Sequence, residues 1–290
     1  MKKFTILIPI YNDWESLTKL LNNINENIKN IKETQFDCVI INDCSTIKNP
    51  KIRIPSQINS VKIIHMSKNK GHARCNAFGI NYLSSSLQFD YLILMDGDGE
   101  DRPEEIKLLV NKILFEPNKS VVAKRIKRSE GFLFQMLYRL HKYITLFTTG
   151  KLIDFGNYSC LTIPDLKILS TKASLWSSYS GSFKKCIQNY NEINSIRGMR
   201  YFGPTQMSLF KLIIHSFSII AVFKYRVFFI SLVLLASLHY IGIFLKFNFL
   251  FIQILTFLFN ILIFITSFRE SKKELENSKS DIDRIENFKH

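Results

Sequence analysis

The stretch that decides the fold is residues 91–101, YLILMDGDGED, where a short apolar run gives way at once to four acids and two glycines. The run Tyr91–Met95 has the length and the polar boundary of a buried β-strand. Residues 102–105, RPEE, then open a helix, because proline and acidic side chains are both favoured in a first helical turn. A buried strand, a polar turn and a helix in immediate succession form the building unit of an α/β sheet.

The same unit recurs along the first two thirds of the chain. Apolar runs predict further strands at Phe4–Pro9, Cys38–Ile41, Val61–His65 and Ser120–Ala123. Segments with apolar residues at helical spacing connect them, the clearest running from Trp14 to Ile31. This alternation predicts a Rossmann-like α/β fold, with a mostly parallel sheet covered on both faces.

Polar clusters follow three of the predicted strands, at residues 11–13 (YND), 42–43 (ND) and 96–101 (DGDGED). Ligands of open α/β sheets bind beyond the carboxyl ends of the strands. We therefore expect these clusters to converge on one crevice, although they are far apart in the sequence.

Asp96 and Asp98 are the central pair of that crevice. Two carboxylates one residue apart at a strand end can address one hard cation, and Glu100 can add a third oxygen. One or two carboxylates together with substrate phosphates are the usual ligands of Mg²⁺, and oxygen ligands also suit Mn²⁺. A D-x-D pattern alone is common in loops, so its position after a strand carries the prediction of a Mg²⁺ or Mn²⁺ site.

The last third of the chain changes character. Residues 227–245 and 247–268 carry no charge, counting His239 as neutral, and span 19 and 22 residues. Since about 20 apolar residues cross a bilayer, two back-to-back runs predict a transmembrane hairpin. We divide the chain into an α/β domain (1–206), an amphipathic juxtamembrane helix (207–226), the hairpin (227–268) and a charged tail (269–290), predicted as a solvated helix or disordered.

Basic residues flank both outer ends of the hairpin, at positions 224, 226, 269, 272 and 273. The positive-inside rule then predicts a multi-pass protein of the cell (inner) membrane, with the catalytic domain and both termini in the cytoplasm.

The net charge of +15 is concentrated in two blocks, residues 119–151 and 197–226, which lead towards the apolar region. Such blocks suit anionic lipid headgroups or phosphates. The membrane segments that follow disfavour nucleic acid as the partner. The five cysteines show no C-x-x-C spacing and are interpreted as buried thiols of a reducing compartment.

Residues 1–206 resemble family-2 glycosyltransferases with the A-type fold, and more narrowly the polyprenyl-phosphate sugar synthases, of which dolichol-phosphate mannose synthase is the best-known type. The matching stretches are residues 8–13 (IPIYND), 42–45 (NDCS), 69–71 (NKG), 95–98 (MDGD) leading to 103–104 (PE), 154–158 (DFGNY) and 197–203 (RGMRYFG). A C-terminal hairpin preceded by amphipathic helices is also typical of that branch. Order and spacing together, rather than any single motif, make the resemblance specific.

The resemblance implies roles for the matching positions. The nucleotide would be bound by Pro9, Tyr11, Asp13, Asp43 and Asp96. The metal would be held by Asp96, Asp98 and Glu100. Catalysis would involve Asp98, Arg125, Arg128 and Arg200. The acceptor phosphate or sugar would be contacted by Asp154, Arg197 and Arg200. One departure is that the family often has two aspartates where this chain has Asn42-Asp43, which weakens a role for position 42 only.

The implied reaction is an inverting transfer of a sugar from a UDP- or GDP-sugar to a polyprenyl phosphate at the cytoplasmic face of the membrane. A lipid phosphate is largely ionised at pH 7, because its second pKa is near 6, so it needs no general base. The absence of an evident base is therefore compatible with activity. Which sugar, nucleotide and lipid are used stays open, as does homo-oligomerisation.

Other interpretations stay open. The acceptor could be a non-phosphate lipid or a lipid-linked glycan, in which case a base such as Asp154 would matter more; Asp154 could equally be a structural turn residue. Arg197 and Arg200 could only snorkel at the membrane surface. A processive polysaccharide synthase is disfavoured by the lack of a Gln-x-x-Arg-Trp motif. A catalytically silent scaffold of the same fold is disfavoured by the retained aspartate pair, and a nucleotide-sensing or lipid-binding module is a weaker alternative.

Overall fold

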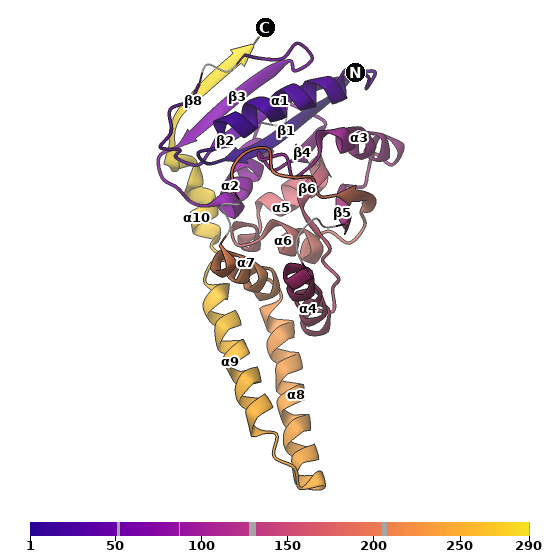
Figure 1. Ribbon diagram of the computed structural model, residues 1–290, viewed down its shortest axis with the longest axis vertical. Coiled ribbons are helices and arrows are strands. Elements are labelled where there is room, and N and C mark those ends of the chain that lie inside the picture. The colour runs from indigo at the N-terminus through magenta and orange to yellow at the C-terminus, as the bar shows by residue number, and fades with distance from the viewer. Residues whose placement is uncertain (51–52, 87, 128–131, 205–207, 290) are drawn as a thin grey trace.

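The computed structural model describes residues 1–50, 53–86, 88–127, 132–204 and 208–289. Within these residues, eight strands form one sheet in the order β7-β5-β6-β4-β1-β2-β3-β8 (Figure 1). Their bounds are β1 Lys2–Ile10, β2 Thr34–Asn42, β3 Ser60–Met66, β4 Tyr91–Leu94, β5 Val121–Lys127, β6 Phe155–Thr162, β7 Asn191–Ile196 and β8 Ile282–Lys289. The central strands β4, β1, β2 and β3 are parallel, as are β5 and β7, whereas β6 and β8 run antiparallel to their neighbours. The predicted mostly parallel α/β sheet is confirmed.

Helices cover both faces of this sheet. Their bounds are α1 Trp14–Ile28, α2 His72–Ser84, α3 Ile106–Phe115, α4 Phe132–Thr149, α5 Ile163–Ser170, α6 Tyr179–Cys186, α7 Leu209–Ala221, α8 Lys224–Leu245, α9 Leu250–Ser267 and α10 Lys272–Asn277, with short 3₁₀ turns at Pro103–Glu105, Ala173–Trp176 and Ser278–Asp281. Helices α1 and α3 pack on one face, and α2, α5, α6 and α10 contribute to the core on the other.

Strand β1 lies in the middle and is buried on both sides. Its residues Phe4, Ile6 and Ile8 enter the core beneath α1 and α3, and Leu7 faces α2. Helix α2 approaches Leu7 at Gly79, where an added Cβ would lie 2.5 Å from the leucine side chain. The strand is continuously apolar because both faces are covered.

Helices α8 and α9 form a long antiparallel pair that extends away from the sheet domain (Figure 1). Both are long and apolar enough to cross a membrane, and only 11% of the residues in the apolar stretch of each helix are buried. Lys246 ends α8 in the left-handed conformation (φ 53°), at the turn that the sequence predicts. At the base of the pair, the Lys224 ammonium lies 3.2 Å from the Glu270 carboxylate.

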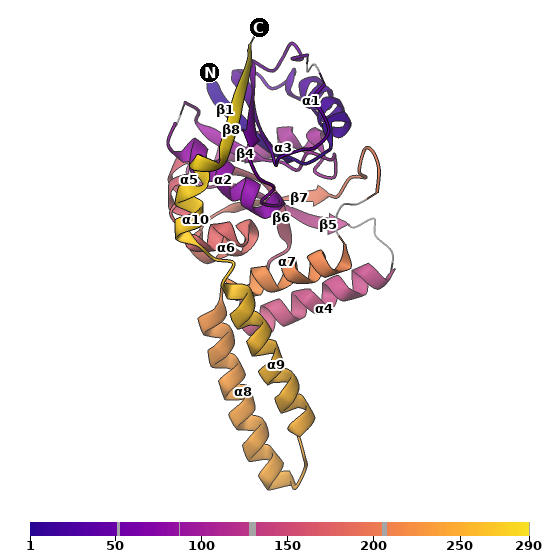
Figure 2. The same ribbon diagram turned by 90° about the vertical axis from the view of Figure 1, so that its left-hand side faces the viewer.

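Helices α4 and α7 pack together between the sheet domain and the hairpin, lying across the direction of α8 and α9 (Figure 2). Helix α7 falls inside the segment predicted as a juxtamembrane helix (207–226), of which residue 207 lies outside the described part. Helix α4 was not anticipated as a partner of α7. Its exposed side chains include Leu140, Tyr143 and Phe147.

The prediction of a solvated helix or a disordered segment for residues 269–290 is wrong for the described residues to 289. The chain returns from the hairpin, forms α10, and adds β8 antiparallel to β3, from Met66↔Ile282 to Ser60↔Lys289. Both termini therefore lie at the sheet end of the molecule (Figure 1). The return is stabilised by apolar burial, since Leu275 is fully buried and Ile282 packs against the same core.

Candidate functional site

The carboxyl ends of β1, β2 and β4 meet at one edge of the sheet, as the sequence predicts. The Asp43 amide donates to the Ile10 carbonyl (2.9 Å), which joins the ends of β2 and β1. At the end of β4, Gly97 passes so close to β1 that an added Cβ would lie 3.0 Å from the Pro9 carbonyl oxygen. Glycine is needed there because backbone approaches backbone.

Asp43 is 3% exposed, and its carboxylate is bonded within the protein. It accepts from the backbone amides of Lys70 (2.7 Å) and Gly71 (2.8 Å). Gly71 has φ +89°, a conformation that glycine adopts without strain. Asp43 thus fixes the loop between β3 and α2 against the end of β2, and its predicted contact with the nucleotide stays a prediction.

Asp96, the first acid after β4, is held by two side chains. His72 Nε2 lies 3.0 Å from Asp96 Oδ1, and the Asn157 amide donates to the same oxygen (3.1 Å). Although enclosure opposes the charge of His72, the neighbouring Asp96, Asp98 and Asp101 raise the pKa of the imidazole to about 9. Burial likewise opposes the charge of Asp96, but His72 holds the pKa of that carboxyl below its usual range. At neutral pH the two groups form an ion pair.

Asp98 faces an arginine that comes from the far end of the domain. Arg200 Nη1 donates to Asp98 Oδ2 (2.9 Å), and its Nη2 bonds the carboxylate of Asp13. Asp98 Oδ1 accepts from the Glu100 amide (3.0 Å), which shapes the acidic turn. One guanidinium therefore joins the end of β1 to the end of β4. This arrangement unites three residues predicted for the site, and Arg200 does not lie free at a membrane surface.

The segment 197–203 lies directly over the acidic turn. Arg197 pairs with Glu100, and the amides of Gly198 and Tyr201 donate to the carbonyls of Glu100 (2.8 Å) and Asp98 (2.9 Å). The Tyr201 ring fills the space beside Gly99, which has φ +88° and no room for a side chain. These contacts explain why glycines alternate with acids in the turn.

Arg125, at the end of β5, reaches the same cluster through a different acid. Its Nη2 lies 3.6 Å from Asp101 Oδ1, and its guanidinium passes over Gly156, where an added Cβ would lie 2.7 Å from Nη2. Asp101 in turn accepts from the Asp96 amide (3.0 Å). Arg125 thus belongs to the site, whereas Arg128, also predicted for it, lies outside the described residues.

The crowded carboxylates create an unfavourable electrostatic environment. Desolvation, followed by the charges of Asp96 and Glu100, raises the pKa of Asp98 to about 6. Burial and Asp96 raise the pKa of Asp101 to about 7. Burial and the neighbouring carboxylates together disfavour the charged forms more than Arg200 and Arg125 favour them. An added cation would be favoured at this position.

Asp154 lies in a second charged cluster, towards α4. It is 4% exposed, and its Oδ2 faces the ammonium groups of Lys124 (3.5 Å) and Lys142 (4.0 Å), with no hydrogen-bond partner among the described residues. Its backbone carbonyl accepts from the Arg125 amide (3.0 Å), so the two clusters share one strand pair. The backbone of Asp154 therefore lies beside that of Arg125, whereas its side chain is directed towards Lys124 and Lys142.

The predicted wall of the nucleotide pocket has one exposed member. Pro9 is buried at the end of β1, whereas Tyr11 is 40% exposed beside it and can offer its ring to a ligand. Asn12 adopts φ 52° and its side chain accepts from the amides of Thr46 and Ile47. This polar loop after β1 is thereby tied to the loop after β2.

A divalent cation fits these residues only as a partly substrate-held ion. Within the described ranges, no three His, Cys, Asp or Glu side chains form a ready cage for a metal. Asp96 and Asp98 provide two hard oxygen donors in a region of excess negative charge, which suits a cation completed by phosphate oxygens and water. Glu100 is engaged by Arg197 and is a weaker third candidate.

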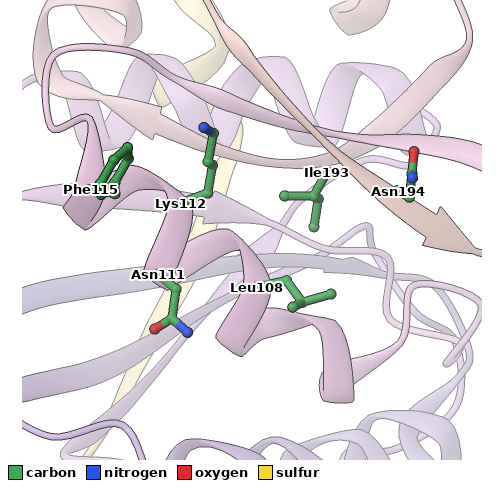
Figure 3. A pocket seen from close by; sticks show the side chains of 6 residues that line it. All are labelled: Leu108, Asn111, Lys112, Phe115, Ile193 and Asn194. Carbon is green, nitrogen blue, oxygen red and sulfur yellow. The ribbon is translucent and has the colours of Figure 1, made fainter.

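Two surface pockets lie apart from this cluster and contain none of its acids. The first, of about 450 Å³, lies between α3 and β7 and is lined by Leu108, Asn111, Lys112, Phe115, Ile193 and Asn194 (Figure 3). The second, of about 520 Å³, is lined by Lys151, Lys184, Ile187, Gln188, Tyr190 and Glu192. The converging charged side chains, rather than hollow volume, therefore define the candidate site.

Three members of the site were not found from the sequence: His72, Asp101 and Asn157. His72 and Asn157 come from α2 and β6 and meet Asp96 only through the fold. The available signals were weak. His72 follows the Asn69-Lys70-Gly71 motif directly, and Asp101 closes the acidic stretch.

Comparison with known proteins identifies the class to which this site belongs. The family model described as "Glycosyl transferase family 2" matches residues 5–169, more than half of the chain. The chain therefore belongs to glycosyl transferase family 2, as predicted.

Its curated relatives include the undecaprenyl-phosphate 4-deoxy-4-formamido-L-arabinose transferases of Photorhabdus laumondii and Serratia proteamaculans. They are 25% and 26% identical over 221 residues, which is 73% of this chain. The chain spans 65% of the length of these relatives. The homology places the chain among relatives of undecaprenyl-phosphate sugar transferases, in agreement with the predicted polyprenyl-phosphate branch.

Among solved structures, the glucosyl-3-phosphoglycerate synthase of Mycobacterium tuberculosis, in complex with Mn²⁺, UDP-glucose and phosphoglyceric acid, has a TM-score of 0.51. The match covers 78% of this chain and 80% of that one, at 12% identity. At this identity the likeness concerns the fold, which is the A-type glycosyltransferase fold that the sequence predicts.

Proposed function

We propose that this glycosyltransferase transfers a sugar from a nucleotide-sugar to a polyprenyl phosphate at the membrane surface. The observation that carries the proposal is the bridge made by Arg200 between Asp13 and Asp98. It brings Asp98, one of the two acids proposed to hold the cation, and a guanidinium suited to phosphate to the carboxyl edge of the sheet, where such folds bind ligands. The acceptor class comes from the relatives, which are named for undecaprenyl phosphate.

In this proposal the donor lies across the ends of β1, β2 and β4. Tyr11 would stack on the base or ribose, with Pro9, Asp13 and Asp43 shaping the pocket. The solved neighbour bound to Mn²⁺ and UDP-glucose supports a nucleotide diphosphate donor in this fold. The proposed donor is a UDP- or GDP-linked sugar.

Asp96 and Asp98 would hold Mg²⁺ or Mn²⁺ on the donor diphosphate. When bound, the ion would stabilise negative charge on the departing nucleoside diphosphate. His72 and Asn157 would keep the Asp96 carboxylate in one orientation, because both contact its Oδ1. Glu100 would be a weaker third ligand of the ion, because it already pairs with Arg197.

The arginines would provide the remaining charge stabilisation. Arg200 would turn from Asp98 towards the diphosphate once a cation relieves that carboxylate, and Arg125 is directed to the same cluster by Asp101. An acceptor phosphate oxygen would attack the anomeric carbon, while the bond from that carbon to the diphosphate breaks with its electron pair. The sugar configuration would invert. Because the attacking oxygen is already ionised, no general base is needed.

The membrane would lie at α4 and α7, with α8 and α9 crossing it. Exposed apolar and aromatic side chains on α4 (Leu140, Tyr143 and Phe147) and basic Arg139 and Lys142 suit the headgroup region. Lysines and arginines at both ends of the hairpin would keep the catalytic domain and both termini cytoplasmic. Arg197 and Asp154 would border the acceptor site between the sheet and this surface.

A second candidate is transfer to a lipid hydroxyl rather than a lipid phosphate. It is favoured by Asp154, whose buried Oδ2 finds no hydrogen-bond partner in the described part of the chain and could accept a proton. The facing ammonium groups of Lys124 and Lys142 weaken it as a base, however, because opposite charges favour the ionised carboxylate.

Release of nucleoside diphosphate tests the proposal. The purified protein in detergent micelles, supplied with Mn²⁺ and a panel of UDP- and GDP-sugars, should release diphosphate only when polyprenyl phosphate is added. Release with polyprenol but not with polyprenyl phosphate would favour the second candidate. No release with any donor would contradict both.

A further inference from the structure

The segment after the hairpin contacts the sheet domain in three ways: by a buried side chain, by a hydrogen bond and by strand pairing. Leu275 of α10 is fully buried, and Glu274 accepts from the Trp176 indole (2.7 Å). Strand β8 pairs with β3 along its whole length, and Ile282 and Phe288 pack on opposite faces of the sheet. The tail is therefore part of the fold that carries the site.

One residue of this segment, Asp281, contacts the loop between β3 and α2. Its backbone carbonyl accepts from the Ser67 amide (2.8 Å). Its carboxylate lies 3.0 Å from the Lys70 ammonium, and both side chains are about three-quarters buried. Asp281 thus holds the loop 67–71 at two points. Its backbone carbonyl bonds Ser67 at one end, and its carboxylate pairs with Lys70 near the other.

Asp43 holds the same loop from the opposite side. The amides of Lys70 and Gly71 donate to its two carboxylate oxygens (2.7 and 2.8 Å). The next residue, His72, reaches Asp96 at 3.0 Å. A shift of this loop would therefore move groups that contact Asp43 and, through His72, Asp96.

We propose that Asp281 is a positioning residue of the donor site, so that affinity for a nucleoside diphosphate depends on docking of the C-terminal segment. The inference rests on the proposed function, in which Asp43 and Asp96 border the nucleotide. It also gives the hairpin a second role. Because the Lys224–Glu270 pair ties the start of α8 to the residues just after α9, only the stretch from Glu270 to Asp281 separates the membrane anchor from the donor pocket.

The first readout needs no ligand. Hydrogen–deuterium exchange of the full-length protein in detergent follows the amides of Lys70 and Gly71 in Asp281→Ala. Those amides should exchange about fivefold faster than in the wild type, because the loop loses its ion pair at Lys70 and keeps only the bond from the Ser67 amide to the backbone carbonyl of residue 281 on that side. Asp283→Ala is the matched control. It lies two residues away on the same segment, and its side chain is 54% exposed and pairs with the adjacent Arg284.

The second readout is the Kd for UDP, measured calorimetrically with Mn²⁺ present. Asp281→Ala should raise it about two- to fivefold, the range expected for a partly exposed ion pair that favours the binding-competent loop. Lys70→Ala should have a similar effect, and the double variant should add little, since both remove the same contact. Asp281→Glu should recover most of the affinity, and Asp283→Ala should leave it unchanged.

The outcomes separate the inference from the proposed function. Unchanged exchange at Lys70 and Gly71 in Asp281→Ala would overturn the positioning role. Faster exchange with an unchanged Kd for UDP would overturn the link to nucleotide binding while leaving the donor site intact. Failure of the wild type to bind UDP or GDP would instead refute the donor site itself, and the inference with it.

Discussion

The Asp98→Asn variant tests the site through two quantities that should respond differently, turnover and the free energy of unfolding. Asparagine has nearly the shape of aspartate and can still accept from the Glu100 amide through its oxygen. It lacks the negative charge that would attract a cation. Activity should therefore be lost without damage to the fold.

The magnitude for stability follows from the raised pKa of Asp98. A rise from 3.8 to about 6 corresponds to about 3 kcal/mol between the two protonation states. The raised pKa means that folding disfavours the charged form of Asp98. A carboxyl whose pKa is raised by folding loses stability as the pH passes from 3.8 to about 6, and the whole cost is present at pH 7.5. Removing that charge should raise the free energy of unfolding of the metal-free protein by up to about 3 kcal/mol.

For turnover, loss of one charge-stabilising group at a reacting diphosphate typically costs about 10²–10³-fold. Turnover is measured as diphosphate release, and stability as thermal unfolding followed by the fluorescence of Trp14 and Trp176. Asp43→Asn is the contrasting variant, because its carboxylate accepts two backbone amides. It should lower stability by about 1–3 kcal/mol. Wild-type turnover by Asp98→Asn, or a clearly lower unfolding temperature of that variant, would refute the role assigned to Asp98.

Three further sets of variants test other parts of the site and the fold. His72→Ala should lower turnover about tenfold, because it frees the Asp96 carboxylate, and His72→Gln should recover part of it; equal activity of all three proteins would remove His72 from the site. Buried His65, between Asn42 and Glu286 and near Arg284, has its pKa lowered by burial, so stability should fall as pH drops below 6.5; thermal scans of His65→Gln should show a shallower fall. Replacing residues 225–269 by a short Gly/Ser linker should preserve UDP binding but abolish transfer to membrane-embedded lipid, whereas deletion of 225–290 should also impair binding, because it removes β8; equal binding by both would contradict the role of the tail.

Much of the fold could be predicted because its information is local. Buried parallel strands are continuous apolar runs, and β1, β2 and β4 differ from the predicted runs only at their ends. The hairpin was equally readable, since two adjacent uncharged apolar runs of membrane-crossing length are typical of transmembrane helices.

The tail could not be predicted for the opposite reason. Strand β8, residues 282–289 (IDRIENFK), is an edge strand with mostly exposed charged side chains, and its apolar residues recur every third position rather than every second. Edge strands are often charged, which discourages pairing with other chains but also hides the strand in the sequence. Only the partner strand β3 reveals it.

The residues of the candidate site likewise divide into those that the sequence predicts and those that only the structure brings together. Asp13, Asp43, Asp96 and Asp98 were found because parallel strands bring their carboxyl ends together. His72 and Asn157 could not be found, because their contact with Asp96 depends on how α2 and β6 are placed beside β4. The ion pairs of Arg200 with Asp13 and Asp98 join residues more than 100 positions apart and required the structure.

The most direct test of the proposed reaction is transfer of radiolabelled sugar by the wild-type protein and Asp98→Asn, with undecaprenyl phosphate or undecaprenol as acceptor. We predict an organic-extractable, mild-acid-labile product from wild type with undecaprenyl phosphate and Mn²⁺. No such product should form with EDTA, with Asp98→Asn or with undecaprenol. Labelled lipid formed equally well by Asp98→Asn, or from undecaprenol alone, would contradict the proposed chemistry.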